Sequence, residues 1–478
     1  MRVSIRSFMS LACTVFAANV ALAQSRKLPE SLTDKEFWEF FATNSEEGGS
    51  FPSENFVSNE QSYQYVIPTL QRSLSSNGVY LGVGPEQNFT YIANIKPRMA
   101  VIFDIRRQNA MAHLMYKALF ELSSTRAEFV SKLFSRPLGP VLGPSSTATE
   151  IFSIALYAKM NDSAFDANRN AIFDNLVRKH GFALTSTDSQ SIKHVYTSFF
   201  EAGPDINYGY RFGAMSAFRP MYSTYAQIQT LTNLDGVNMA FLANEANYQY
   251  LRELHKKNLI VPVVGDFAGP KAIRGVGEYL RERHATVTAF YLSNVEQYLY
   301  KGPDDASRFY KNVAALPIDT TSTFIRSVPP NNAGGMLSIL SSQGMSFGAS
   351  PITNNYYSVQ VIDSGGVSVV LTTSDSAGRP VTKRTIDTST TNRPSALDIF
   401  RRLRARDDSL LRLRVDSATN GGGAIPTGPL NQGRTIIANA STLVSGLASI
   451  RETLEAFNAA RLPQYSDVIA MTKTSGWK

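Results

Sequence analysis

Apolar runs and helical apolar spacings alternate through the middle of this chain. Runs that begin at Val79 and Val101, and later runs at 259–264 and 286–292, are continuous rather than alternating. Continuous runs of this length are typical of strands that are buried on both faces of a parallel sheet. A further strand is predicted at 322–327. Since helical patterns separate the runs, the order predicts an α/β fold with a mostly parallel sheet.

A long stretch between the second and third strands has helical character. Apolar residues recur at helical spacing in 109–137, the spacing continues in 147–182 after a break rich in proline and glycine, and 240–257 repeats it. We therefore predict a helical insertion at 109–257. Its segment 203–228 is crowded with tyrosine and phenylalanine, which predicts either a lid or pocket wall or the ordinary packing of a long connection.

The segment before the first strand, residues 24–77, is predicted to form short helices. Capping-box patterns begin at Thr33 and at Ser58, and an apolar cluster follows each of them. Helices in such a position usually pack across a sheet or over the mouth of a ligand site.

The C-terminal region, residues 328–478, has a different character from the core. Proline- and glycine-rich linkers separate a predicted hairpin at 357–386, a basic amphipathic helix from Arg401 to Arg414, and a final helix at 436–461. The basic helix is either a solvated face on a docking helix or a contact with an anionic membrane surface.

The first residues have the pattern of a secretory signal peptide. Arg2 and Arg6 precede a short apolar run, and an A-x-A cleavage site ends at Ala23. Cleavage removes Cys13, which is the only cysteine, so the mature chain is expected to contain neither a disulfide nor a thiolate ligand. We therefore predict a protein that is exported to the periplasm or secreted.

The net charge of the chain indicates which class of partner to expect. The formal charge of +8 falls to +6 without Arg2 and Arg6, and charged residues make up 18% of the chain. This excess is modest for 478 residues, so nucleic-acid binding is not expected. A small-molecule ligand is the partner that the sequence favours, and nothing in it defines an oligomeric state.

The most specific chemical signal is a glycine turn between the first two strands. Gly82 and Gly84 follow the first strand, Glu86 begins a helix, and Asp104 ends the second strand about twenty residues later. In Rossmann-type sheets such glycines let the backbone approach a nucleotide, and such a carboxylate binds the ribose hydroxyls. The motif is incomplete, since Glu86 or Gln87 stands where related motifs have a third glycine. Asp104 is alternatively a cap for the segment that follows it.

This signal completes the expected fold and its boundaries. We predict a Rossmann-like α/β core with a mostly parallel sheet, the helical insertion, and a C-terminal appendage of hairpin and helices. The expected parts are a signal peptide at 1–23, an N-terminal helical segment at 24–77, the core at 78–327 and the C-terminal region at 328–478.

Further polar residues follow other predicted strands. Asp266 lies just after the C-terminal end of the strand at 259–264, where ligands bind in open α/β sheets, and Asn294 follows the strand at 286–292. Asp266 is alternatively the N-cap of the helix that begins near Pro270. With Glu86, these side chains are expected on one edge of the sheet.

Other chemistries lack their motifs. The G-x-S-x-G pattern at 344–348 has no histidine after it, which argues against a serine hydrolase. The five histidines are scattered without ligand spacing, so no metal is expected. The missing third glycine argues against a dinucleotide-dependent oxidoreductase. The sequence does not identify a residue that would act as a catalytic base.

Five segments together resemble a family of uncharacterised bacterial exported proteins whose core is similar to the class I S-adenosylmethionine-dependent methyltransferase fold. They are LGVGPEQN at 81–88, FDIRR at 103–107, VVGDFAGP at 263–270, YLSNVE at 291–296 and STFIRS at 322–327. The resemblance covers roughly residues 50–327. It implies that Gly82 and Gly84 approach the methionine part of the cofactor, that Asp104 binds the ribose, and that Asp266 and Phe267 lie near the adenine or the substrate mouth.

The resemblance and the export signal lead to two hypotheses. The first is a methyltransferase-like core that binds a nucleoside-containing ligand, with S-adenosylmethionine as the expected cofactor. Methyl transfer depends mainly on positioning, so it does not require histidine or cysteine. The alternative is a non-catalytic periplasmic or envelope binding protein that retains the fold without the reaction. The export signal favours the second hypothesis, because the methyl donor is not expected outside the cytoplasm.

Overall fold

The computed structural model describes residues 27–210, 222–329, 356–363, 367–374, 380–387 and 443–474. The predicted signal peptide, the segment from Arg401 to Arg414 and the G-x-S-x-G pattern at 344–348 lie outside these residues. Contacts within the chain divide it into two units, one made of residues 1–344 and 440–478 and the other of residues 345–439.

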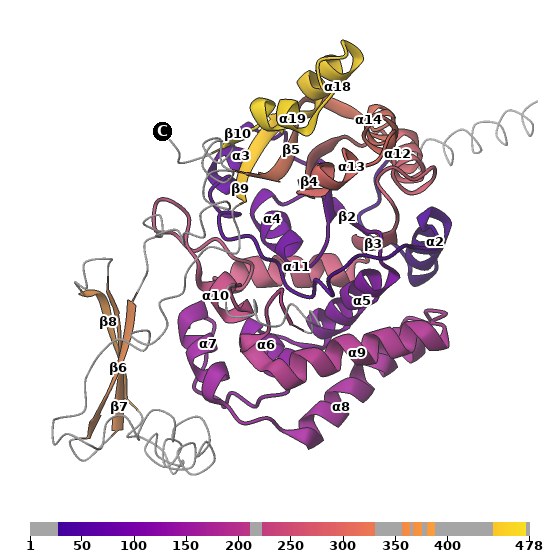
Figure 1. The fold of residues 1–478 in the computed structure, drawn as a ribbon. Coiled ribbons are helices and arrows are strands. Elements are labelled where there is room, and N and C mark those ends of the chain that lie inside the picture. The colour runs from indigo at the N-terminus through magenta and orange to yellow at the C-terminus, as the bar shows by residue number, and fades with distance from the viewer. Residues whose placement is uncertain are drawn as a thin grey trace, which may run out of the picture. The chain divides into compact units, whose positions relative to one another are not determined.

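The larger unit is built on a seven-stranded sheet with the order β10-β9-β5-β4-β1-β2-β3 (Figure 1). The five consecutive strands β5, β4, β1, β2 and β3 are parallel, whereas β9 and β10 form antiparallel pairs at the other end of the sheet. The strands are β1 Val79–Val83, β2 Met99–Asp104, β3 Ile260–Val264, β4 Val287–Ser293, β5 Ile318–Val328, β9 Val444–Ser449 and β10 Lys473–Thr474. The α/β fold class and the mostly parallel sheet are therefore confirmed.

The strand order makes this a doubly wound sheet. The chain proceeds from β1 outward through β2 to β3, and then returns past them to β4 and β5 on the other side of β1. Because parallel crossovers are right-handed, this reversal places the helices of the two halves on opposite faces. α4 (Gln87–Ile95) contacts α11 (Glu245–Lys256), whereas α12 (Ala272–Glu282) contacts α14 (Asp305–Ala314).

The apolar composition of β1 to β4 explains why these segments form buried strands. β1 to β4 are almost completely buried, as continuous apolar runs require. Pro262 lies within β3 and cannot donate a hydrogen bond to a neighbouring strand. β3 is an edge strand, where a proline is tolerated.

The predicted helical insertion lies between β2 and β3, although its helices are shorter than the sequence suggests. The expected helix at 109–137 breaks after Leu122, where Thr125 caps a second helix. Most of α5 (Arg107–Leu122) is buried, from Asn109 to Phe120. The helices are α5 Arg107–Leu122, α6 Arg126–Phe134, α7 Ala148–Tyr157, α8 Asp162–Phe173 with a π-helix at Asp174–Lys179, α9 Ser186–Ala202 with a 3-10 turn at Gly203–Asp205, α10 Tyr225–Thr230 and α11 Glu245–Lys256.

The N-terminal segment contains two described helices, α2 Asp34–Asn44 and α3 Ile67–Ser73. The capping box predicted at Thr33 is confirmed, since Thr33 and Glu36 satisfy each other's backbone N–H groups. The one predicted at Ser58 is wrong. The Ser58 hydroxyl bonds Gln87 instead, and α3 begins after Val66 without a side-chain cap.

The core does not end at residue 327, where the sequence analysis places its boundary. β9 pairs with β5 from Thr323 to Val328, so the end of the chain returns to the central sheet. The predicted single helix at 436–461 is correspondingly wrong, since Val444–Ser449 is a strand and α18 spans only Ile450–Asn458. The remaining helices of this half are α13 Val295–Leu299 and α19 Tyr465–Met471.

The smaller unit contains a three-stranded antiparallel sheet of β6 Tyr356–Asp363, β7 Val367–Ser374 and β8 Pro380–Asp387. β7 pairs with both of its neighbours. The hairpin predicted at 357–386 is therefore confirmed, with a third strand. Among the described residues, no helix has the length and apolarity that crossing a membrane requires.

Candidate functional site

The candidate site is the rim of the sheet, which we define as the carboxyl ends of β1, β2, β3 and β4 with the turns that follow them. The strand order reverses between β1 and β4. Open α/β sheets bind ligands at such a reversal, because the two adjacent connections leave toward opposite faces and open a crevice. Gly84 after β1 and Ser293 at the end of β4 lie at this point of the rim.

The two glycines of the predicted motif have different roles. A Cβ on Gly82 would lie 1.9 Å from the carboxamide oxygen of Asn88 and 2.7 Å from the ring of Tyr80. Tyr80 donates a hydrogen bond to that oxygen over 2.8 Å. Gly82 therefore makes room for internal packing within β1.

Gly84 is the glycine that shapes the turn. It has a left-handed φ of 78°, and a Cβ built on it would meet only Asn55, at 3.6 Å. Its N–H donates to the carbonyl of Phe103 over 3.1 Å, which ties the turn to β2 immediately before Asp104. The structure thus brings Gly84 and Asp104 together, as the motif predicts.

The carbonyl of Gly84 points into the protein. It accepts a hydrogen bond from the Asn109 carboxamide over 3.1 Å, and Nε2 of His113 lies 2.9 Å away. Burial lowers the pKa of His113 to about 4, so the ring is neutral at pH 7 and donates from Nε2 to this carbonyl. Asn109 and His113 of α5 therefore hold the Gly84 turn in place through its backbone carbonyl.

Asp104 is paired with an arginine of its own turn. Arg106 donates from its backbone N–H over 2.8 Å and from Nε over 3.1 Å to Oδ1 of Asp104, and from Nη2 over 3.0 Å to Oδ2. Asp104 is 6% exposed. Three of the roughly four positions at which a carboxylate accepts hydrogen bonds are therefore occupied by Arg106.

A segment near the N-terminus lies along the whole rim, and we call residues 45–62 the rim strap. At β3, Glu46 donates from its backbone N–H to the carbonyl of Val264 over 2.8 Å. At β2, Gly49 donates to the carbonyl of Ile105 over 2.7 Å, and Nη1 of Arg106 donates to the strap carbonyls of Ser53 and Glu54.

The rim strap ends at the carboxyl end of β4, beside the start of α4. Oε1 of Glu60 accepts hydrogen bonds from Tyr291 over 2.8 Å and from Ser293 over 2.6 Å, and Oε2 accepts one from Gln87 over 2.8 Å. Glu60 is almost completely buried. Its carboxylate therefore occupies the point where the strand order reverses.

Glu86 is buried beside this carboxylate network. Its Oε1 accepts a long hydrogen bond of 3.4 Å from the Ser58 N–H, and Oε2 has no partner among the described residues. Burial raises the pKa of the Glu86 carboxyl to about 8. Its proton is therefore retained at neutral pH, which avoids an unpaired buried charge.

At the β3 end of the rim, the strap supplies the charge at a helix N-terminus. Oε1 of Glu46 accepts from the N–H groups of Lys271 and Ala272, and Oε2 accepts from that of Asp266, each over 3.0 Å. A carboxylate at this position is favoured by the α12 macrodipole. Gly269 leaves room for it, since a Cβ there would lie 2.5 Å from Glu46.

Replacing Glu46 with alanine is expected to lower the free energy of unfolding by about 2–3 kcal/mol, because three backbone donors lose a charged partner. Urea unfolding of the purified protein measures this loss. Glu47→Ala is the matched control, since Glu47 is exposed. A loss no larger than that of the control would show that Glu46 does not hold the loop.

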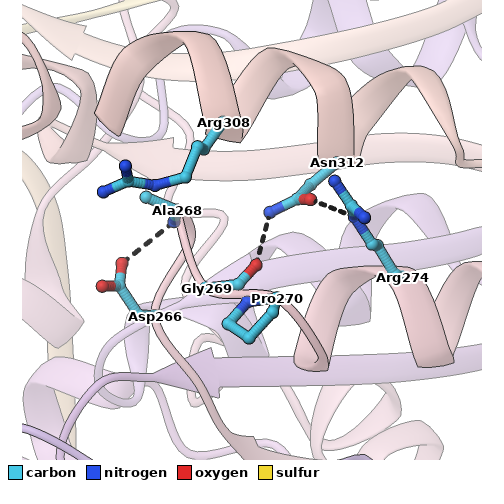
Figure 2. Close-up of a pocket in the computed structure, with 7 residues that line it drawn as sticks. All are labelled: Asp266, Ala268, Gly269, Pro270, Arg274, Arg308 and Asn312. Carbon is cyan, nitrogen blue, oxygen red and sulfur yellow. Dashed lines mark hydrogen bonds between the residues drawn. The ribbon is translucent and has the colours of Figure 1, made fainter. Parts of the chain in front are cut away.

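Asp266 and Phe267 lie at this end of the rim but have different environments. Phe267 is buried, with its ring stacked 5.6 Å from that of Phe309, so its side chain belongs to the core. Oδ1 of Asp266 accepts from the N–H of Ala268 over 2.9 Å. Asp266 also lines a cavity of about 330 Å³ between the loop after β3 and helices α12 and α14 (Figure 2).

The structure therefore brings Gly84, Glu86 and Asp104 to one part of the rim and places Asp266 after β3, which is next to β2 and two strands from β1. Sequence reasoning missed three residues that dominate the site. Arg106 follows Asp104 closely, and its charge beside the acid was a usable signal. Glu46 and Glu60 reach the rim from the preceding segment, which carries no motif for such a position. In the described part of the chain, no cluster of three or more His, Cys, Asp or Glu side chains could hold a metal ion.

The fold and the rim define a Rossmann-like, doubly wound α/β protein in which the rim strap lies over the carboxyl ends of the central strands. The chain belongs to the family described as a domain of unknown function (DUF7790), whose model matches residues 55–136 and 156–352. No curated protein matches the chain.

Proposed function

We propose that the rim binds a nucleoside-containing ligand in the manner of methyltransferase-like Rossmann domains, with S-adenosylmethionine as the leading candidate. The observation that carries this proposal is the junction of Gly84 and Asp104. The open, left-handed glycine turn is hydrogen-bonded to the end of β2, next to the carboxylate, at the reversal of strand order. The ligand would run along the rim from Gly84 toward Asp104.

The proposal requires a specific rearrangement. A ribose that bonds both oxygens of Asp104 must displace at least part of the Arg106 side chain. Arg106 also donates to two strap carbonyls, so its displacement loosens the strap over β2. Ligand binding and strap movement are therefore coupled in this proposal, and methyl transfer is its most specific form.

The alternative is an exported binding protein of the periplasm or envelope that retains the fold without the reaction. The filled crevice favours this alternative. The Glu60 carboxylate accepts three hydrogen bonds, two from the end of β4 and one from the start of α4, and it occupies space that a cofactor would need. In this alternative the strap is a permanent part of the fold.

Calorimetric titration of the purified protein with S-adenosylmethionine and S-adenosylhomocysteine separates the two functions. The first predicts binding in the micromolar range. Asp104→Asn is expected to weaken that binding at least about tenfold, because the amide cannot accept both ribose hydroxyls as a carboxylate does.

The control must remove a comparable ion pair without changing the rim. Asp188 accepts two hydrogen bonds from Arg107, which lies next to Arg106, so Asp188→Asn is the matched variant. Binding that Asp104→Asn weakens and Asp188→Asn preserves supports the ribose role of Asp104. Equal effects of the two variants would remove that role. No binding of either ligand at millimolar concentration would leave the non-catalytic alternative.

A further inference from the structure

The cavity at the β3 end of the rim is lined by one carboxylate and two guanidinium groups. The Asp266 carboxylate comes from the loop after β3, Arg274 from α12 and Arg308 from α14. Figure 2 shows the guanidinium of Arg308 reaching from α14 toward the Asp266 carboxylate, with Arg274 on the other side of the loop. The cavity volume of about 330 Å³ is at the lower end of the range for small-molecule sites.

The walls of this cavity are held in place by one buried residue. Nδ2 of Asn312 donates to the carbonyls of Phe267 and Gly269, each over 2.8 Å, and Oδ1 accepts from Nε of Arg274 over 2.6 Å. Glu46 holds the same loop from the other side. Since the loop and Arg274 are positioned before any ligand arrives, binding costs little ordering.

The charged groups retain capacity for a ligand. Oδ1 of Asp266 accepts a hydrogen bond from the Ala268 N–H, and Oδ2 has no hydrogen-bond partner among the described residues. Arg308 contacts Asp305 through Nη2, and Arg274 contacts Asn312 through Nε. Two guanidinium groups remain able to bind a carboxylate, while the carboxylate of Asp266 repels a simple anion and attracts a cation.

From this arrangement we propose that the cavity binds a small zwitterion that carries an ammonium and a carboxylate group, the chemistry of a free α-amino acid. The ligand carboxylate is bound by Arg308, with Arg274 contributing positive charge, and the ligand ammonium is bound by Asp266. The cavity adjoins the proposed nucleoside site, because β3 pairs with β2 and the Gly265 N–H donates to the backbone carbonyl of Asp104 over 2.9 Å. The zwitterion proposal uses only Asp266, Arg274 and Arg308, so a failure of nucleoside binding would not overturn it.

Three small probes test the pairing of charges. Glycine carries both groups, acetate carries only the carboxylate and methylammonium only the cation. Titration by ligand-observed NMR at low salt is expected to give millimolar or tighter binding of glycine. Acetate and methylammonium are each expected to bind at least about tenfold more weakly, because each loses one charge-assisted contact.

Two variants assign the contacts. Arg308→Gln is expected to weaken both glycine and acetate, and Asp266→Asn to weaken glycine and methylammonium while sparing acetate. The amide oxygen that Asp266→Asn introduces still accepts the Ala268 N–H, so this variant preserves the loop. Lys311→Gln is the control, since Lys311 is exposed on α14 and does not line the cavity.

Several outcomes would overturn the proposal. Equal affinity for acetate and glycine would show an anion site, as would binding of inorganic phosphate without glycine. Glycine binding that neither Arg308→Gln nor Asp266→Asn changes would place it elsewhere on the protein. No glycine binding at about 10 mM would show that the cavity is not an amino-acid site.

Discussion

Replacing Arg326 with methionine is expected to lower the free energy of unfolding by about 3–5 kcal/mol, the cost of breaking a buried ion pair on one side. Arg326 on β5 donates to Glu296 from Nε over 2.6 Å and from Nη2 over 2.9 Å. Both side chains are nearly inaccessible, at 1% and 3% exposure. Without the guanidinium, the Glu296 carboxylate keeps only one hydrogen-bond donor in the described part of the chain, the hydroxyl of Tyr310.

The pair also connects parts of the chain that are far apart in sequence. Nη1 of Arg326 lies 3.5 Å from the hydroxyl of Thr472, which follows α19. Loss of Arg326 is therefore expected to loosen the C-terminal helices together with β5. Hydrogen exchange of α18 and α19 in the variant measures this local effect separately from global urea unfolding.

A second substitution distinguishes the buried charge from lost packing. Adding Glu296→Gln to Arg326→Met removes the unpaired carboxylate, so the double variant is expected to be more stable than Arg326→Met alone. Asp174→Asn is the surface control, because its partner Arg178 is largely exposed, and its loss is expected to be below about 1 kcal/mol. A double variant less stable than either single one would show that the two charges are not compensating each other.

Replacing Glu86 with glutamine is expected to remove a pH-dependent loss of stability that amounts to as much as about 5 kcal/mol. The pKa of Glu86 is raised from 4.5 to about 8 in the folded protein, mainly by burial. The folded protein therefore binds a proton that the unfolded chain releases between these values. Its contribution to stability is complete below pH 4.5 and is lost as the pH rises to about 8.

The wild-type profile alone does not isolate this group, because His113 acts in the opposite direction. Its folded pKa is lowered to about 4 from 6.5, so it makes the protein more stable as the pH rises through that range. The measured quantity is therefore the difference in unfolding free energy between Glu86→Gln and wild type. That difference is expected to shift in favour of the variant from about pH 5 to about pH 8.5.

An exposed carboxylate supplies the control for Glu86. Glu39 is largely exposed, and Glu39→Gln is expected to give a difference that changes little with pH. A flat profile for Glu86→Gln would contradict a neutral, buried Glu86. The absolute offset at the acidic end is not diagnostic, since the new amide group also lacks a partner for its N–H groups.

The parallel part of the fold could be predicted from the sequence because burial on both faces leaves a direct trace. β1 to β4 are continuous apolar runs, and each predicted run became a strand. β9 left no such trace. Its residues VSGLAS are small and only weakly apolar, and they form a strand because β5 offers an open edge for pairing. That edge is a tertiary property, so local pattern alone predicted a helix there.

The candidate site was predictable where local geometry determines it. Gly84 must be a glycine because its φ is left-handed, and Asp104 follows from the end of β2. The role of Gly82 was not predictable, since its close contact with Asn88 depends on how α4 packs against β1. The strap contacts of Glu60 with Tyr291 and Ser293 join residues more than two hundred positions apart, and no spacing rule anticipates them.

Because β5 pairs with β9, the chain between these two strands is an insertion that could be exchanged for another sequence. Val328 and Val444 are register partners, so the intervening chain leaves and re-enters the sheet at neighbouring positions. Lengthening such a connection costs little, about 0.6 kcal/mol for each doubling of its length. The family match ends at residue 352, inside this connection. Evolution, or a protein engineer, could therefore replace the smaller unit with another domain without redesigning the sheet that carries the rim.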